Sequence, residues 1–379
     1  MVSEATRART AALLPPEWDR AADHRIDLPN DVGPTAMGEA LRLLVDDPGA
    51  DSVMVLYAPP VSGGHADVAA AVLDAVQAGS AGPVVACFLG NRDAGLLRRK
   101  GLVIPEFPFP EEAALALARV AQYGEWRASP SGELPTLADA DVDAARRSVV
   151  HLLDGHPAGR WLDPLQATDL LTTHGIVPIP GRLVGDADEA VAAAHAIGYP
   201  VAVKATGLAR LAKTEAGGVA LDVHGDDEIR QAYGRMRDHL GAAMQPALVQ
   251  SMAEPGVECL IGLHRHPVLG DVMTLGAGGA MAERLEQVAL RILPLTDADA
   301  RRLISASRIS TLLDDAGAGA RDALEDLLLR LGALAEAAPE VAQVRLNPVL
   351  VGSAGAAVTD VQIRLEPWEP DPRPEVRRL

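Results

Sequence analysis

Gly198-Tyr-Pro-Val-Ala-Val-Lys-Ala205 is the stretch of sequence that decides the fold. Val201–Ala205 is a short apolar run, which predicts a buried strand with Lys204 near its end. An Ala-rich helix is expected just before it, over Asp186–Ile197, and a glycine-containing turn just after it. A lysine that leaves a strand toward glycines can hold nucleotide phosphates, because its ammonium supplies charge and glycines let backbone N–H groups approach. Taken alone, the pattern also fits an ordinary surface lysine.

Two segments that follow extend this pattern. Lys213 stands shortly before Gly217 and Gly218, which places a second ammonium beside a glycine loop. The apolar run Ala247–Ser251, which contains Gln250, predicts another strand, and Glu258 follows eight residues after Gln250. Backbone groups at the end of such a strand can bind an adenine edge, and a carboxylate can accept hydrogen bonds from ribose hydroxyls. A plain strand with a surface glutamate fits the second segment equally well.

A small-residue turn comes next, at Gly278 and Gly279, and it is followed by Glu283. Arg291 then lies inside the apolar run Val288–Ile292, which predicts a strand. An arginine in an apolar run needs an anionic partner. Either Glu283 or a bound phosphate would serve.

The C-terminal third ends in a pair of predicted strands, Val344–Val351 and Ala357–Ile363, after a long helix at Asp322–Ala337. Asn347 lies in the first strand and Asp360 in the second. On adjacent strands an amide oxygen and a carboxylate can ligate Mg²⁺, a hard ion that takes its remaining ligands from water and phosphate. The alternative is a turn asparagine and a strand-end aspartate with no ion.

The first third alternates strands with helices. Apolar runs at Asp51–Tyr57, Pro83–Leu89 and Gly101–Ile104 predict strands, and helices are expected at Asp67–Ala78 and Glu111–Trp126. Strands separated by helices of this length predict a parallel sheet with helices on its faces.

The amino-acid composition limits the kinds of binding partner that we expect for this protein. The net charge of −18 argues against nucleic acid or an anionic membrane, because both would repel this surface. Cys87 and Cys259 are too far apart in sequence for a zinc motif or a disulfide framework, which fits a reducing cytoplasm. No apolar run reaches membrane-spanning length, and the N-terminal segment does not look like a signal peptide. A cytoplasmic protein is therefore expected.

The order of these pieces resembles the ATP-grasp half of ADP-forming acetyl-CoA synthetases and succinyl-CoA synthetase β chains, over about Leu162–Leu365. The segments that match the family most specifically are Gly198–Lys204, Gly276–Gly279, Val288–Leu295 and Leu346–Val349. The resemblance implies ATP and Mg²⁺ as cofactors, with Lys204 and Lys213 facing the phosphates, Gln250 at the adenine hinge and Glu258 near the ribose. The full nucleotide-binding set that we predict is Lys204, Lys213, Gly217, Gly218, Gln250, Glu258, Gly278, Gly279 and Arg291, with Asn347 and Asp360 as metal ligands.

The first third is similar to the flavodoxin-like ligase domain that precedes ATP-grasp in fused synthetases, notably at Phe107-Pro-Phe-Pro-Glu111. The predicted fold class is therefore α/β, a flavodoxin-like parallel-sheet domain followed by a two-lobed ATP-grasp domain. The predicted boundaries are 10–127 for the CoA-ligase domain, 128–140 for a linker, 141–366 for the ATP-grasp domain and 367–379 for a disordered tail.

The chain departs from the family pattern at two positions. Ala212 stands where the family has a histidine implicated in phosphate transfer, and Arg345 replaces an acidic residue two positions before Asn347. The CoA-binding domain and the domain with the main phosphohistidine are also expected to be missing. The resemblance thus implies the nucleotide half of an ADP-forming acid–CoA ligase, which acts with a partner chain that carries those domains and which can assemble into an oligomer.

A rival hypothesis is a regulatory pseudoenzyme that binds nucleotide or acyl-CoA without turnover, like the degenerate synthetase modules of acetyltransferase fusions. Ala212 and Arg345 favour it. A weaker hypothesis is a relic that no longer binds ATP. Separately, His174 precedes Gly175 at an expected helix end, so we interpret it as a helix C-cap residue whose imidazolium would suit the helix dipole.

Overall fold

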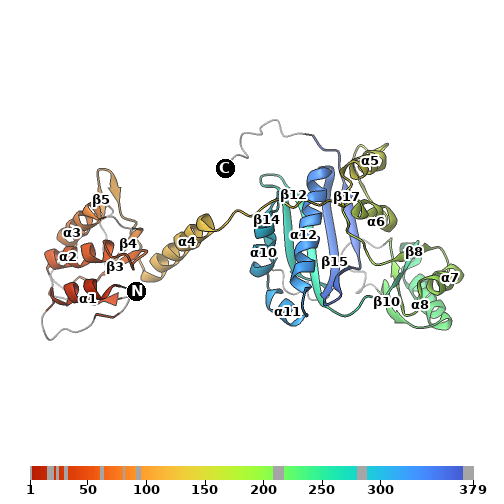
Figure 1. The fold of residues 1–379 in the computed structure, drawn as a ribbon, viewed down its shortest axis with the longest axis horizontal. Coiled ribbons are helices and arrows are strands. Elements are labelled where there is room, and N and C mark those ends of the chain that lie inside the picture. Colours follow the sequence, from red (N-terminus) through yellow and green to blue (C-terminus); the bar gives the residue numbers. More distant parts are fainter. Residues whose placement is uncertain are drawn as a thin grey trace. The chain divides into compact units, whose positions relative to one another are not determined.

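The computed structural model describes residues 2–14, 21–22, 25–29, 33–59, 64–79, 82–90, 95–207, 217–279 and 288–369. The chain divides into two units, Met1–Ser129 and Pro130–Leu379 (Figure 1). The predictions for Lys213, Ala212, Glu283 and the last ten residues of the tail lie outside the described residues.

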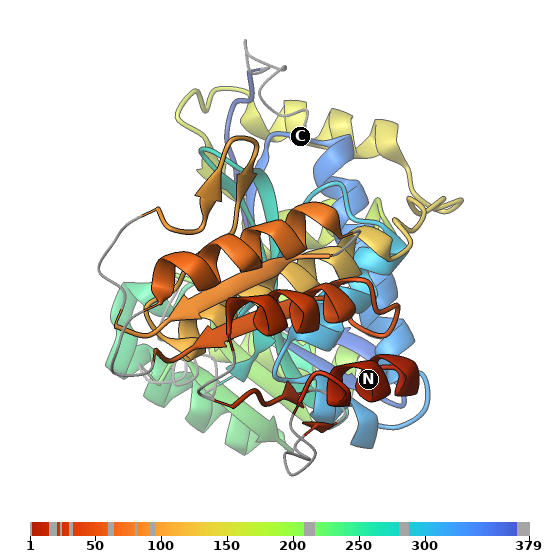
Figure 2. The ribbon, with the colours of Figure 1, turned by 90° about the vertical axis from the view of Figure 1, so that its left-hand side faces the viewer.

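The first unit is built on a pair of parallel strands, β3 and β4, paired from Val53↔Val84 to Tyr57↔Phe88. Figure 2 shows helices α2 and α3 side by side in front of these strands, and α4 contacts the strands as well. The described elements are α1 (Glu4–Ala11), β1 (Ala21–Ala22), β2 (Arg25–Ile26), α2 (Pro34–Val45), β3 (Val53–Tyr57), α3 (His65–Ala78), β4 (Val84–Phe88), β5 (Arg98–Arg99), β6 (Leu102–Val103) and α4 (Pro110–Ala128).

One expectation for this unit is wrong. The run Gly101–Ile104 was predicted as a third strand of the parallel sheet, but β6 pairs antiparallel with β5. The residue that bridges in parallel to Ala86 of β4 is Glu106. Gly101 has φ +82°, so the chain turns there into a short hairpin and reaches the sheet only afterwards.

The second unit contains two sheets with their own helices. The smaller sheet has the antiparallel order β10-β9-β11-β8, and α7 and α8 pack on it around the buried Tyr233 and Ile229. The elements of this lobe are β8 (Gly181–Val184), α7 (Ala187–Ile197), β9 (Val201–Ala205), β10 (Val219–Val223), α8 (Asp226–Leu240), the 3₁₀ turn η1 (Gly241–Met244) and β11 (Ala247–Ser251).

The larger sheet has the order β14-β13-β12-β15-β17-β7, with β16 paired to β15. Its elements are α5 (Val142–Leu153), β7 (Arg160–Trp161), α6 (Pro164–Thr172), β12 (Val257–His266), β13 (Gly270–Ala277), β14 (Ala289–Ile292), α10 (Asp297–Ala306), α11 (Ser310–Asp315), α12 (Ala320–Ala337), β15 (Val341–Gly352), β16 (Gly355–Val358) and β17 (Val361–Leu365).

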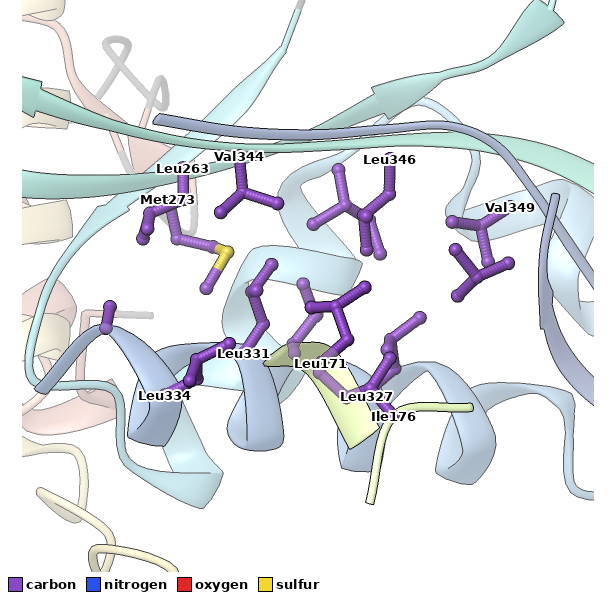
Figure 3. Packing of buried hydrophobic residues seen from close by; sticks show 14 of the residues in the cluster. Leu171, Ile176, Leu263, Met273, Leu327, Leu331, Leu334, Val344, Leu346 and Val349 are labelled. Carbon is purple, nitrogen blue, oxygen red and sulfur yellow. The ribbon is translucent and has the colours of Figure 1, made fainter. Parts of the chain in front are cut away.

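Helix α12 covers one face of the larger sheet. Figure 3 shows Leu331 and Leu334 of this helix pointing toward Leu263, Val344 and Leu346 of the strands. Each such buried side chain contributes roughly 1.5–3 kcal/mol relative to exposure. Because side chains alternate along a strand, the residues between the buried ones face away from α12. In β15 these include Arg345 and Asn347.

The two lobes of this unit are joined by hydrogen bonds as well as by the chain. The N–H of Ile179 donates to the carbonyl of Val358 at 3.0 Å. Among the described helices, none combines the length and the apolar character that a membrane crossing requires.

Candidate functional site

Lys204 lies where the two lobes of the second unit meet. It is on β9, the strand between β10 and β11, on the sheet face opposite α7 and α8, and only 8% of it is exposed. Its Nζ donates to Oε1 of Gln250 and to the backbone carbonyl of Thr359, both at 2.8 Å. Thr359 belongs to the other lobe, so one ammonium links the smaller sheet to the strands of the larger one.

Gln250 extends this link. It lies on β11, the strand next to β9, is 5% exposed, and donates from Nε2 to the carbonyl of Ile179 at 3.0 Å. Its amide thus accepts from the lysine and donates to the connector before β8. The chain leaves β11 immediately afterwards and enters the larger sheet, as a hinge strand would.

Asn347 and Asp360 meet through their backbones. The N–H of Asn347 donates to the carbonyl of Asp360 at 3.2 Å. The side chain of Asn347 accepts, through Oδ1, a hydrogen bond of 3.0 Å from the N–H of Gly279. Since Asp360 directly follows Thr359, the contact of Lys204, the Asn347–Asp360 pair lies next to the ammonium.

Gly278 and Gly279 form a turn that holds Glu258. The N–H of Gly278 donates to the carbonyl of Glu258 at 2.8 Å. Gly279 has φ +59°, and a Cβ built on it would overlap the carboxylate of Glu258. A side chain at Gly279 would therefore displace that carboxylate. The turn brings Glu258, both glycines and Asn347 into one contact group.

Three further predicted residues lie elsewhere or make only indirect contact. The carbonyl of Gly218 accepts from the N–H of Ala205, next to Lys204, at 2.8 Å. Gly217 has φ +67°, where glycine is favoured, and the nearest atom to its Cβ position belongs to His239. Arg291 on β14 pairs with Met273, a fully buried residue of the α12-side core.

Paired residues of neighbouring strands share a face, so the register places Arg291 on the helix-covered side of the larger sheet. Asn347 faces the other way. The contact that the structure gives the Arg291 side chain is a hydrogen bond of 2.7 Å from Nη1 to the carbonyl of Leu290. A nucleotide contact by Arg291 stays a prediction.

A cavity of about 610 Å³ opens beside the glycine turn. Glu258 and Gly278 line it together with Asp315 of α11 and Ser353 of the β15–β16 turn. Lys204 and Asn347 do not line it. The cavity thus shares Glu258 and Gly278 with the glycine turn and reaches toward α11.

Sequence reasoning did not find the carbonyls of Thr359 and Ile179, which anchor Lys204 and Gln250. A backbone carbonyl has no signature in sequence, because every residue carries one. Burial of a lysine is the observable sign that such acceptors exist, since a buried ammonium must be hydrogen-bonded.

Comparison with known proteins places residues 156–365 in a family model described as an ATP-grasp domain, which is more than half of the chain. Acetate–CoA ligase [ADP-forming] I of Archaeoglobus fulgidus is 28% identical over 354 residues, covering 90% of this chain and 50% of that protein. Acetate–CoA ligase [ADP-forming] II subunit beta of Pyrococcus furiosus is 31% identical over 217 residues, covering 53% of this chain and 90% of that subunit.

A similar solved structure is acetyl-coenzyme A synthetase 1 of Ca. Korarchaeum cryptofilum in complex with coenzyme A, Ca-AMPCP and HgCl⁺. It has a TM-score of 0.53 and 29% identity, and it covers 59% of this chain and all of the matched chain. The chain spans half or less of the length of several curated relatives that it matches.

Proposed function

Since the chain belongs to the ATP-grasp family and is a homologue of the ADP-forming acetate–CoA ligases, we propose that it binds ATP with Mg²⁺ and serves as the nucleotide-binding part of an acid–CoA ligase. The observation that carries this proposal is the position of Lys204. Its buried ammonium lies between the two lobes and contacts Thr359, the residue before Asp360. The proposed metal ligands Asn347 and Asp360 are therefore close to it.

The residues present fit a nucleotide. Lys204 offers an ammonium at the junction of the two lobes, and the glycine at position 279 leaves room for the carboxylate of Glu258 beside the turn. In this proposal Lys204 holds a phosphate oxygen and Glu258 accepts from a ribose hydroxyl. Gln250 keeps Lys204 in position through its 2.8 Å hydrogen bond.

The residues also fit Mg²⁺. Asn347 offers an amide oxygen and Asp360 a carboxylate, the oxygen ligands that this ion prefers. Within the described ranges, no three His, Cys, Asp or Glu side chains gather in a metal-binding group, so phosphate and water oxygens would complete the shell. When bound, Mg²⁺ would neutralise phosphate charge and ATP would supply the phosphoryl group that ADP-forming ligation consumes.

A partner chain is part of the proposal. The Pyrococcus furiosus relatives that match are named as beta subunits, and this chain covers 90% of each. We propose that a second chain supplies the coenzyme A site and the phosphate-carrying histidine. The acid that would be ligated is set by that partner.

A calorimetric titration with Mg-ATP tests nucleotide binding. Lys204→Ala should weaken binding by about tenfold or more, because a hydrogen bond to a charged group contributes about 1.5–3 kcal/mol. Lys100→Ala is the matched control, since Lys100 is exposed and lies in the other unit. Equal affinities of the parent and Lys204→Ala, with both folded, would contradict the proposed site.

A second experiment separates the ligase from the regulatory candidate, which Arg345 favours because it puts a cation near the proposed metal ligands. The chain is incubated with γ-labelled ATP, with and without candidate partner chains. Label on a histidine of either chain, or ADP release that depends on added acid, supports the ligase. Thermal stabilisation by Mg-ATP with neither result supports a nucleotide-sensing regulator.

A further inference from the structure

We propose that Arg345 binds the nucleotide phosphates. Its guanidinium supplies part of the positive charge that a metal ion, held by an acidic residue at this position, would otherwise supply. This inference rests on the proposed nucleotide site and adds a specificity-determining residue to it.

The register directs Arg345 toward the site. Val344 and Leu346, its chain neighbours, are 1% and 0% exposed and belong to the core under α12. Arg345 and Asn347 therefore share the opposite face of the strand. Two residues along a strand are about 7 Å apart, which is within the reach of an arginine side chain. Arg345 and Asn347 can thus contact the same ligand.

No side chain across the sheet neutralises this arginine. Its partner on β12 is Gly262, and its partner on β17 is Gln362. Arg345 is half-buried, yet it forms no hydrogen bond or ion pair with any residue in the described part of the chain. The Oε1 of Gln362 is buried and also has no partner among those residues, so the two side chains do not satisfy each other.

Two other arginines of this sheet, Arg364 and Arg265, are held by acids. Arg364 on β17, on the same face, donates to Glu366 and lies over the ring of Trp161. Arg265 on β12 pairs with Asp271 at 2.9 Å. A half-buried guanidinium needs an anion, and its planar fork matches phosphate oxygens in two places at once. A polyphosphate beside Asn347 meets that need.

Two consequences follow from the charge. The guanidinium attracts the phosphates, and it repels a divalent cation held by Asn347 and Asp360. Nucleotide binding should therefore depend less on Mg²⁺ than it would with a carboxylate at this position.

The test is a titration of the full chain with adenosine 5′-(β,γ-methylene)triphosphate and with AMP, in Mg²⁺ and in EDTA. The parent should keep triphosphate binding in EDTA within about tenfold of its affinity in Mg²⁺. Arg345→Ala should lose about tenfold or more in EDTA and change little toward AMP. Arg345→Lys should recover part of the loss, and Arg345→Glu should bind only when Mg²⁺ is present. Arg364→Ala should titrate like the parent.

The inference is overturned if Arg345→Ala is merely less stable to heat and binds the triphosphate in EDTA as the parent does. A parent that binds in Mg²⁺ but not in EDTA overturns it as well, while the proposed function stands. If the parent binds no nucleotide under either condition, the proposed function fails and this inference fails with it.

Discussion

Gly278 and Gly279 are adjacent, but different parts of the molecule constrain them. A Cβ on Gly278 would lie 2.6 Å from the carbonyl carbon and oxygen of Cys259, which belong to the β12 backbone. A Cβ on Gly279 would meet the carboxylate of Glu258, the end of a flexible side chain. Gly278 thus constrains the fold of the turn, whereas Gly279 constrains where Glu258 lies.

Gly278→Ala should lower the free energy of unfolding by about 1–3 kcal/mol, because the backbone of β12 must shift to admit the methyl group. Urea denaturation measures this change. Gly234→Ala in α8 is the control, since no atom outside its helix lies within 4 Å of the new Cβ. That variant should gain about 0.5–1 kcal/mol, because alanine is the better helix former. A similar loss in both variants would disprove the backbone argument.

At the scale of elements, α12 is the helix that organises the larger sheet. Its Leu324, Leu328 and Leu331 are all fully buried. They recur at spacings of four and three, which gives one continuous apolar face. Asn347 and Arg345 lie on the opposite face of the same sheet, so the packing of α12 sets the plane from which these two side chains project.

Leu331→Ala should destabilise the chain by about 2–5 kcal/mol, because the lost contacts leave a cavity against Val344 and Leu346. Leu312→Ala in α11 is the comparison, as this leucine is 55% exposed. It should change stability by no more than about 0.5 kcal/mol. Thermal and urea denaturation of both variants check the difference, and equal effects would contradict the assignment of the core.

At the scale of the whole molecule, stability should depend on pH through His174. The predicted role of this residue as a charged helix C-cap was wrong: the C-cap of α6 is Thr173, and His174 is fully buried. Its Nδ1 lies 2.9 Å from Thr173 Oγ1, and its Nε2 has no partner within the described residues. Burial, and then the charge of Arg330, hold the pKa of His174 below its ordinary 6.5, against the opposing charge of Asp141.

A lowered pKa means that the folded state binds the proton less well than the unfolded state. The contribution of His174 is complete above pH 6.5 and is lost as pH falls through the folded pKa. Asp139 and Asp226 also have lowered pKa values, caused first by hydrogen bonds from Arg330 and Tyr199, but they act below the ordinary 3.8. These two carboxylates therefore add little to the pH dependence between pH 7 and pH 5.

Melting temperatures between pH 7 and pH 5 should fall for the parent and stay flatter for His174→Phe, which cannot be protonated. His151→Phe is the control because His151 is exposed. Its profile should follow that of the parent. If the parent and His174→Phe show the same slope, burial of a neutral imidazole does not govern stability in this range.

Much of the architecture follows from local pattern. The strands Val201–Ala205 and Ala247–Ser251 have the bounds that the sequence predicts, because apolar runs of this length bury well as strands. The α/β fold with an ATP-grasp domain is confirmed by the structure and the family match. Helix α8 was not predicted, although Ile229, Tyr233 and Met236 recur on one face of it.

The run Ala357–Ile363 was predicted as one strand but forms two, β16 and β17. Between them the N–H of Thr359 donates to the carbonyl of Pro348. This break places the Thr359 carbonyl where Lys204 reaches it. Local pattern does not encode such a kink, because the residues that cause it lie on a different strand.

By itself, the amino-acid sequence determined which residue types this protein offers to the proposed nucleotide site: a strand-end lysine, paired glycines, an asparagine and an aspartate. Hydrophobic periodicity and turn residues are local features, so they can be recognised from the sequence alone. Only the tertiary structure decided which of them meet. It joined Lys204 to Thr359 across 155 positions, directed Arg291 toward the helices and left Arg345 facing the site, because strand register depends on pairing between distant segments.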